Sequence, residues 1–281
     1  MLLALGVVLV LAARNAAHGS VRDGVAIDPA AFSPGACRAF APTNGDRHLT
    51  VFLDAGHGGI DPGAVGTTGS GQRIEEADET LPVVLDAMTL LRQRGFRVVV
   101  SRTQASSVAR LGPGDVAGGM LTLQGAHDDV AARDVCANQA HADALVGVYF
   151  DSGTTAQNAG SVTAYDADRP FAARNLRLAT LVQQDVLASM NAQGWAIPDE
   201  GVLPDGSLGS AYSAQATSYG HLLLLGPAQG GWLSTPSQMP GALIEPLFIT
   251  DPFEGSIAVS GRGQQIIAGG LARAVEQYFA G

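Results

Sequence analysis

A histidine enclosed by glycines follows a short strand-forming segment, residues 50–53, early in the chain. The run after this segment reads DAGHGGIDPG over residues 54–63, with His57 near its centre. Open α/β sheets bind ligands at the carboxyl ends of their strands. Glycines remove side-chain bulk, so a metal ion or a substrate can come close to the backbone. His57 is therefore a candidate ligand, although a glycine-rich turn that merely ends a strand has the same pattern.

Two glutamates stand at comparable places. Glu76 precedes a segment with helical spacing of apolar residues. Proline is unfavourable deep inside a helix, so Pro82 predicts that this helix begins near residues 80–81, with Glu76 at its mouth. An acid there also suits the helix dipole, and Glu75 or Asp78 could take the same part. Glu245 lies in the apolar run ALIEPL, where an unpaired carboxylate is costly, which indicates a functional role.

Strands alternate with helices along the chain, which predicts a single-domain α/β fold. The expected sheet is mostly parallel and twisted, with helices on both faces. Residues 104–125 and 191–220 are expected to be loops, and the irregular pattern of residues 20–47 indicates a tail before the folded domain at 48–281. The expected strands are 49–54, 97–101, 144–150, 162–165, 221–225 and 242–247. The expected helices are one ending at Gly95 and others over 128–142, 170–190 and 264–279.

The first residues favour export. Residues 1–13 are almost all apolar, too few for a membrane span of ~20 residues but typical of a secretory signal. Residues 1–19 are thus expected to be a signal peptide or an N-terminal hydrophobic segment, with cleavage after Ala17 or Gly19. An exported chain with two cysteines, Cys37 and Cys136, is expected to join them, although two unrelated buried thiols would give the same count.

Composition excludes some partners. The chain has 281 residues, 46% of them apolar, so it can bury a sizeable core, and its formal charge is −10. This acidity disfavours nucleic acid and anionic membranes. A phosphate site at the glycine run is also disfavoured, because no helix is expected directly after it and the sequence contains no lysine.

The motifs together resemble the zinc-dependent N-acetylmuramoyl-L-alanine amidases of amidase family 3. The match begins at the long run over residues 54–66 and continues through Glu76, the strand at 95–98 and the SRT sequence at 101–103. Arg133 with Ala137–Asn138 and the late strand around Glu245 complete it. The resemblance covers roughly residues 48–279 and makes residues 48–281 an amidase-like catalytic domain.

The resemblance implies a function and a site. Such enzymes cut the amide between N-acetylmuramic acid and the L-alanine of the peptidoglycan stem peptide. It implies that His57 and Glu76 bind zinc and that Glu245 is the general base. Zinc lowers the pKa of a bound water to about 7 and polarises the scissile carbonyl. The implied protein is secreted, in the periplasm or at the cell wall, binds peptidoglycan or muropeptides, has no stable membrane span and is a monomer.

One position departs from the family pattern. The third zinc ligand of the family is a strand histidine, and Tyr149 stands there. Asp151 could substitute from the same side of the strand, displaced by ~6.6 Å along it. Alternatively, His141 or His221 could supply the third ligand. In a third alternative, the protein is a weak or inactive relative that binds peptidoglycan or regulates another hydrolase. The sequence leaves these alternatives open.

Overall fold

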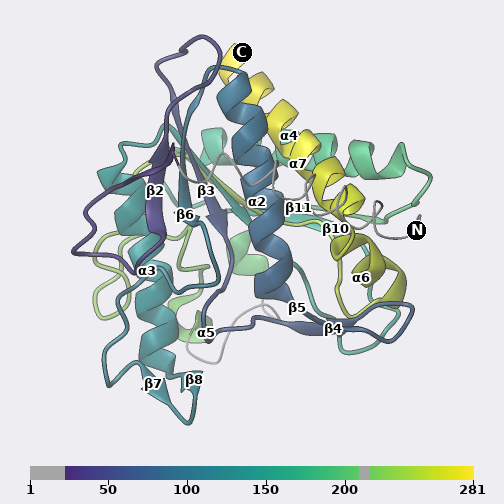
Figure 1. Cartoon of the computed structure of the whole chain (residues 1–281), viewed down its shortest axis with the longest axis horizontal. Coiled ribbons are helices and arrows are strands. Elements are labelled where there is room, and N and C mark those ends of the chain that lie inside the picture. The colour runs from purple at the N-terminus through teal and green to yellow at the C-terminus, as the bar shows by residue number, and fades with distance from the viewer. Residues whose placement is uncertain (1–22, 209–215) are drawn as a thin grey trace, which may run out of the picture.

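The computed structural model describes residues 23–208 and 216–281. The expected signal segment, residues 1–19, lies outside the described residues. In the described part, the elements build one mixed sheet with helices on both faces, and two small hairpins project from it (Figure 1). None of the described helices combines the length and apolar character that a membrane span needs.

The central sheet has eight strands in the order β1-β2-β6-β3-β9-β12-β10-β11. The four adjacent strands β6, β3, β9 and β12 are parallel, as are β10 and β11, whereas β10 runs antiparallel to β12. The prediction of a mostly parallel α/β sheet is confirmed. The strands are β1 (Val25–Ala26), β2 (Ala36–Phe40), β3 (Thr50–Ala55), β6 (Arg97–Arg102), β9 (Ala144–Val148), β10 (Ser161–Tyr165), β11 (Asp199–Pro204) and β12 (Gly241–Glu245).

The described part of segment 20–47 is not irregular, in contrast to the expectation. It supplies β1 and β2, and β2 pairs antiparallel with β6 at the edge of the sheet. Four of the five β2 residues are buried. Pairing with β6 and packing against α3 stabilise β2, although its own short sequence does not predict a strand.

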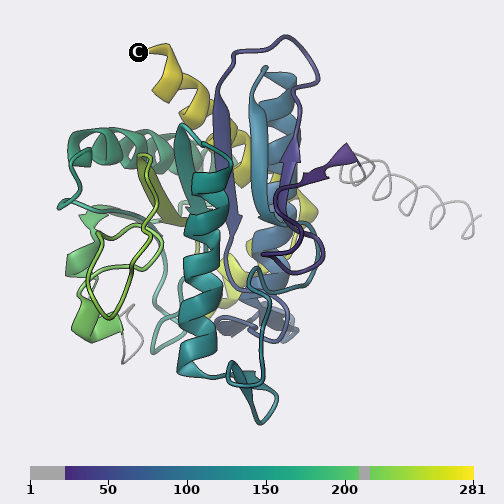
Figure 2. The ribbon, with the colours of Figure 1, turned by 90° about the vertical axis from the view of Figure 1, so that its left-hand side faces the viewer.

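Helices cover the two faces unequally. On one face, α2 (Glu76–Gln93), α4 (Ala172–Asn191) and α7 (Gly261–Ala280) pack on apolar side chains of the sheet and form the larger core. On the other face, α3 (Leu123–Gln139) shares a second core with segment 222–239. Figure 2 shows the teal α3 in front of the sheet and the blue α2 behind it. The predicted helices on both faces are confirmed.

Three helices begin earlier than predicted, among them α7, which starts at Gly261 rather than near residue 264. Helix α2 starts at Glu76 and contains Pro82. Because proline has no N–H, the carbonyl oxygen of Asp78 lacks its helical hydrogen bond, but Asp78 is an exposed residue in the first turn. The helix ends before Gly95, as predicted, with Gly95 at φ +87°. Helix α3 starts at Leu123 because Thr122 caps it, accepting a hydrogen bond from the Gly125 N–H.

The segment after α4 differs most from the expectation. The predicted loop over 191–220 contains β11, the short 3₁₀ helix η2 (Asp205–Ser207) and α5 (Ala216–Tyr219). The predicted strand over 221–225 is a series of turns instead. Leu222, Leu224 and Leu225 pack in the second core, so burial rather than strand pairing explains the apolar pattern. The remaining elements are β4 (Val65–Thr67), β5 (Arg73–Glu75), β7 (Val116–Ala117), β8 (Met120–Leu121) and α6 (Pro252–Ala258).

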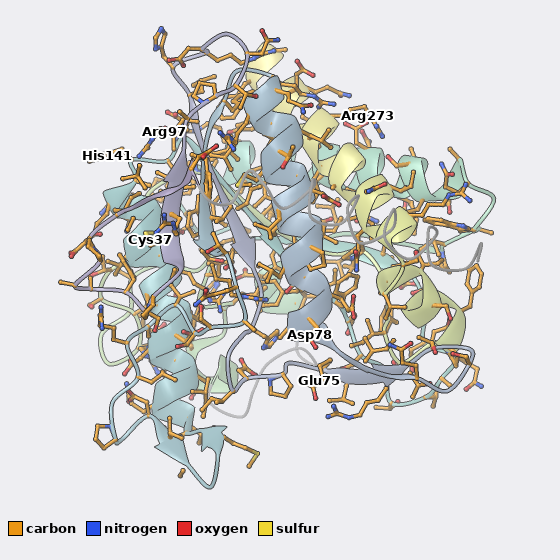
Figure 3. The ribbon with its side chains drawn as sticks, in the orientation of Figure 1. Cys37, Glu75, Asp78, Arg97, His141 and Arg273 are labelled. Carbon is orange, nitrogen blue, oxygen red and sulfur yellow. A yellow bond between two sulfur atoms is a disulfide. The ribbon has the colours of Figure 1, made fainter. Side chains whose placement is uncertain are left out.

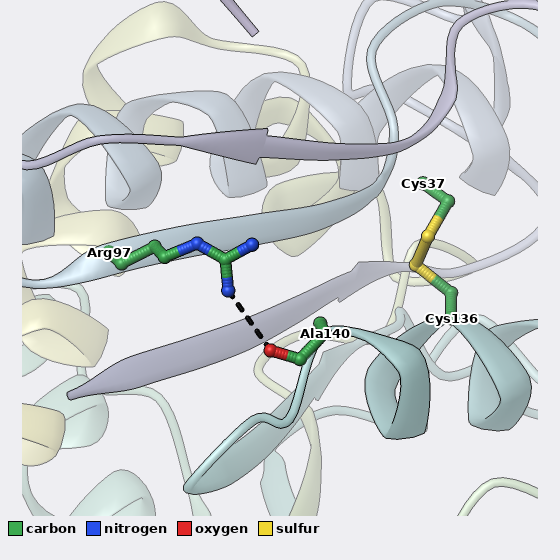
Figure 4. Close-up of a disulfide and its surroundings, with 4 residues drawn as sticks. All are labelled: Cys37, Arg97, Cys136 and Ala140. Carbon is green, nitrogen blue, oxygen red and sulfur yellow. Dashed lines mark hydrogen bonds between the residues drawn. A yellow bond between two sulfur atoms is a disulfide. The ribbon is translucent and has the colours of Figure 1, made fainter. Parts of the chain in front are cut away.

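A disulfide joins Cys37 of β2 to Cys136 of α3, as the sequence predicted. It ties the antiparallel strand β2 to the helix on the second face (Figure 4). Nearby, Arg97 of β6 donates a hydrogen bond to the Ala140 carbonyl at 3.0 Å, next to the end of the same helix. Strand β2, the central sheet and α3 are thereby held together at two points.

Candidate active site

The carboxyl ends of β3, β9 and β12 meet at one edge of the sheet, next to the start of α2. A cavity of about 1000 Å³ opens there. Its floor carries the candidate residues His57, Glu76, Tyr149, Asp151 and Glu245. Its sides come from α3 and from segment 222–232, which are joined where His127 Nε2 contacts the Trp232 carbonyl oxygen at 2.5 Å.

His57 lies in the turn directly after β3 and is held by two carboxylates. Its Nδ1 is 2.8 Å from Asp61 Oδ2, and its Nε2 is 3.1 Å from Glu76 Oε2. Burial alone would lower the pKa of His57, but Glu76 and Asp61 outweigh it and raise that pKa to about 10. Without a metal ion, the imidazole therefore carries a proton at neutral pH.

Glu76, the first residue of α2, is the acid that the fold brings to His57. Its side chain is 3% exposed, and its two oxygens accept hydrogen bonds from the backbone N–H groups of Phe150 and Ala64 at 2.9 and 2.8 Å. Glu75 pairs with Arg73, and Asp78 is exposed. Figure 3 shows Glu75 and Asp78 near this end of α2.

Two glycines are needed for this close arrangement. A Cβ on Gly63, which has φ +67°, would lie 2.6 Å from Glu76 Oε2 and from the His57 ring. A Cβ on Gly56 would lie 2.6 Å from the Tyr149 ring. Neither distance is compatible with a side chain, so the glycines of the run permit the approach of the residues around His57.

The arrangement of His57 and Glu76 fits a zinc site in part. Two ligand atoms on one tetrahedral zinc, each about 2.0–2.1 Å from the ion, lie about 3.3 Å apart. The observed 3.1 Å between Nε2 and Oε2 agrees. Asp61 holds the other ring nitrogen, as outer carboxylates do for metal-binding histidines. Within the described residues, however, no third carboxylate, histidine or cysteine has its ligand atom close to both.

Tyr149 is directed away from that pair. Its hydroxyl donates a hydrogen bond of 2.9 Å to Asp54 Oδ2, and its ring makes an edge contact with the His57 ring. The other oxygen of the buried Asp54 pairs with Arg133 NH1. Burial and the Asp54 carboxylate raise the pKa of Tyr149 well above its usual value, so the hydroxyl keeps its proton.

Arg133, on α3, organises the floor of the cavity. Its guanidinium pairs with Asp54 and Asp129 and also donates to the carbonyl oxygens of Ala55 and His57. The side chain is 1% exposed, and those of Asp54 and Asp129 are nearly as buried. The network fixes the backbone at the end of β3, and hence the position of His57.

Asp151 and Glu245 face each other across neighbouring chain segments. Residues 149–151 continue β9 beside 247–249, with Asp151 bridged to Phe248. The two carboxyl groups share a hydrogen bond, and burial together with the mutual repulsion of their charges raises the pKa of Glu245 well above its usual value. Burial also raises the pKa of Asp151. Glu245 is the last residue of β12, where Pro246 follows.

The two histidines offered as alternative third ligands, His141 and His221, lie away from the pair of His57 and Glu76. His141 is exposed at the turn after α3, near the Arg97 end of the sheet, as Figure 3 shows. His221 contacts Asp166 and Asp205, which follow strands β10 and β11. These strands run antiparallel to β12, so their carboxyl ends, and His221 with them, lie at the other end of the strands from His57.

Sequence reasoning missed the roles of Asp54 and Asp61. Both belong to the glycine run, and each has a recognisable signal. Asp54 is a carboxylate at the end of an otherwise apolar strand, which requires a buried partner. Asp61 follows His57 by four residues in a turn that folds back on itself through the paired backbone groups of Gly58 and Asp61.

Known proteins resemble this chain over most of its length. Protein YqiI of Bacillus subtilis (strain 168) is 27% identical over 230 residues, 82% of this chain and 84% of that protein. The CwlD amidase of Clostridioides difficile, solved in complex with the GerS lipoprotein, has a TM-score of 0.61 at 20% identity, covering 83% of this chain and 98% of that one.

Two further solved structures share the fold. The N-acetylmuramoyl-L-alanine amidase AmiC2 of Nostoc punctiforme has a TM-score of 0.57 at 23% identity and covers 84% of this chain and all of that one. The amidase Ami1 of Mycobacterium smegmatis has a TM-score of 0.57 at 19% identity, with coverage of 85% and 99%. The family model of the N-acetylmuramoyl-L-alanine amidases (Amidase_3) matches residues 51–277 of this chain. The chain therefore belongs to the Amidase_3 family of N-acetylmuramoyl-L-alanine amidases.

Proposed function

We propose that the protein is an exported peptidoglycan hydrolase that cleaves the amide between N-acetylmuramic acid and the L-alanine of the stem peptide. The observation that carries this proposal is the convergence of His57 Nε2 and Glu76 Oε2 at 3.1 Å in a cavity that also contains Glu245. Family membership supplies the reaction class. The cavity volume of about 1000 Å³ suits a sugar with an attached peptide.

His57 and Glu76 would hold a zinc ion, with Asp151 as the third ligand. A bound zinc would polarise the scissile carbonyl and lower the pKa of a water molecule. Asp61 keeps the His57 ring oriented with Nε2 toward Glu76. Asp151 lies at the same cavity and would have to leave its hydrogen bond with Glu245 to serve as a ligand.

Glu245 would be the general base. Its position at the end of β12 places the carboxylate at the cavity, and its raised pKa suits a group that accepts a proton from water and returns it to the leaving amine. Asp54, Tyr149 and Arg133 would act as positioning residues, since they fix the floor on which His57 lies.

The second candidate is a weak or inactive relative that binds peptidoglycan or regulates another hydrolase. The observation that favours it is the orientation of Tyr149, whose hydroxyl is bonded to Asp54 and whose pKa is raised well above its usual value. A tyrosine in that state is a poor replacement for a histidine ligand. Only two protein ligands then remain in register, and loss of a third weakens metal binding severely.

The two candidates are separated by measuring zinc content and muropeptide cleavage on the same purified protein. The amidase proposal expects release of stem peptide and one zinc per chain whose binding depends on His57 and Glu76. Glu245→Gln should abolish cleavage without changing the zinc content, and Glu76→Gln should abolish cleavage and lower the zinc content by one per chain. Glu75→Gln is the matched control, because Glu75 is adjacent in sequence but pairs with Arg73. Binding of muropeptides without cleavage, even with added zinc, would favour the second candidate.

A further inference from the structure

We propose that Asp166, Asp205 and His221 form a second divalent metal site that holds one wall of the cavity in place. Each residue offers one ligand atom, and these atoms lie within 4.8 Å of one another. Two carboxylate oxygens and one imidazole nitrogen suit Zn²⁺ or another first-row divalent metal ion. The inference is independent of whether the amidase site is active.

The topology brings the two aspartates together. Asp166 directly follows β10 and Asp205 directly follows β11, and these strands are parallel with Tyr165 paired to Pro204. Neighbouring strands lie about 4.8 Å apart, so the two carboxylates start from adjacent positions. The site therefore lies at the carboxyl ends of two parallel strands, the usual place for ligands in α/β sheets.

One buried oxygen of Asp166 lacks a hydrogen-bond donor. The Asp166 side chain is fully buried, and its Oδ1 accepts hydrogen bonds from the N–H groups of Asp168 and Arg169 in the bend before α4. Its Oδ2 has no hydrogen-bond partner, although it lies 2.9 Å from His221 Nδ1. A buried carboxylate oxygen without a donor is costly, and a bound cation would remove that cost.

The charges also call for a cation. Asp166 and Asp205 are 0% and 1% exposed, so two negative charges are buried side by side. The neighbouring Arg169 directs its guanidinium to the carbonyl oxygens of Leu225, Gly226 and Ser237. A protonated His221 would offset one of the two charges, whereas a divalent ion with a neutral imidazole would offset both.

His221 is oriented as a metal ligand is. Its Nδ1 faces Asp166 and Asp205 at 2.9 and 3.4 Å, whereas its Nε2 is 3.7 Å from the exposed Asp168 carboxylate. Tyr219 packs edge-on against the same ring and restricts its rotation.

The site is coupled to the cavity through the next residue. The Leu222 N–H donates to Asp205 Oδ2 at 2.9 Å, and residues 222–224 line one side of the cavity. None of the three proposed ligands lines the cavity itself. A metal ion here would therefore shape the wall near the substrate without taking part in the reaction.

The test uses the full chain with His57→Ala and Glu76→Ala, so that metal at the amidase site does not contribute. Zinc content after dialysis and the rise in Tm on adding Zn²⁺ or Mn²⁺ are measured. We expect one zinc per chain and a rise in Tm. Asp166→Asn and His221→Gln in the same background should each weaken zinc binding by about 100-fold or more and abolish the Tm rise.

Two variants keep the outcome interpretable. Asp166→Asn retains an oxygen that can accept the hydrogen bonds from Asp168 and Arg169, and His221→Gln leaves both aspartates, so failure of one variant to fold leaves the other as a test. His141→Gln, an exposed histidine far from the site, should bind zinc unchanged. The proposal is overturned if the His57→Ala/Glu76→Ala protein binds no zinc, or if both ligand variants bind it as the background does.

Discussion

The Tyr149 hydroxyl donates a hydrogen bond to Asp54 Oδ2 at 2.9 Å, and Arg133 occupies the other oxygen of the same carboxylate. A residue at the position of a family zinc ligand is thus used to satisfy a buried charge. This relationship joins the chemistry of the site to the stability of the sheet end that carries it.

Replacing Tyr149 separates the two roles. Tyr149→His should place an imidazole at the third ligand position and strengthen zinc binding by about 100-fold, with higher amidase activity. Tyr149→Phe is the control, since it removes the same hydroxyl without adding a ligand. Both variants should lose about 1–3 kcal/mol of stability, because Asp54 Oδ2 loses its donor. Zinc titration and urea unfolding measure the two effects, and equal zinc affinity in both variants would contradict this account.

His57 should stay protonated through neutral pH in the metal-free protein. Its pKa of about 10 lies above the ordinary 6.5, so the folded state binds the proton more tightly than the unfolded state. This contribution to stability is complete below pH 6.5 and is lost as pH rises through about 10. The His57 ring resonances, followed by NMR in the zinc-free protein, should not titrate between pH 6 and 8.

Removing the two carboxylates tests the cause of that shift. Asp61→Asn and Glu76→Gln should each lower the pKa of His57, because each removes a negative charge within 3.1 Å of the ring. Zinc must displace this proton to bind Nε2, so zinc affinity should rise with pH between 6 and 8. A His57 ring that titrates near 6.5 in the unmodified protein would show that the carboxylates only offset the effect of burial and do not raise the pKa.

Loss of the disulfide should destabilise the fold. Cys37 and Cys136 are 99 residues apart, and the loop-closure entropy for such a span corresponds to about 4 kcal/mol. The Cys37→Ser/Cys136→Ser protein should melt about 10 °C lower. Calorimetry with and without a reductant measures the difference. The double variant should respond no further to the reductant, and an unchanged melting temperature would show that β2 is held by pairing with β6 alone.

Arg133 should be more important for stability than any surface arginine. Arg133→Met leaves Asp54 and Asp129 buried without their cation, which should cost about 3–5 kcal/mol. Arg262→Met, an exposed arginine bonded to Gln193, should cost less than about 0.5 kcal/mol. Urea unfolding compares them. Similar losses in the two variants would mean that the Asp54 network contributes little.

The sequence by itself determined the family and the order of the central elements. The glycine run around His57, the helix before Gly95 and the apolar strand ending at Glu245 are local patterns, fixed by burial and by backbone conformation within a few residues. The pairing of Cys37 with Cys136 also followed from the number of cysteines and the expected export. These features depend little on which segments meet in space.

Only the tertiary structure decided how distant polar residues are paired. In the sequence, Tyr149 stands where the family has its third zinc ligand. Its hydrogen bond to Asp54 is evident only in the structure, where β3 and β9 lie side by side. The role of Arg133 likewise depends on α3 crossing the end of β3. Asp166 and Asp205 come together because β10 and β11 lie side by side and parallel, and β2 forms because β6 offers a strand to pair with. A buried charge needs a partner that can come from any segment of the chain, and the spacing of residues in the sequence does not show which segment that is.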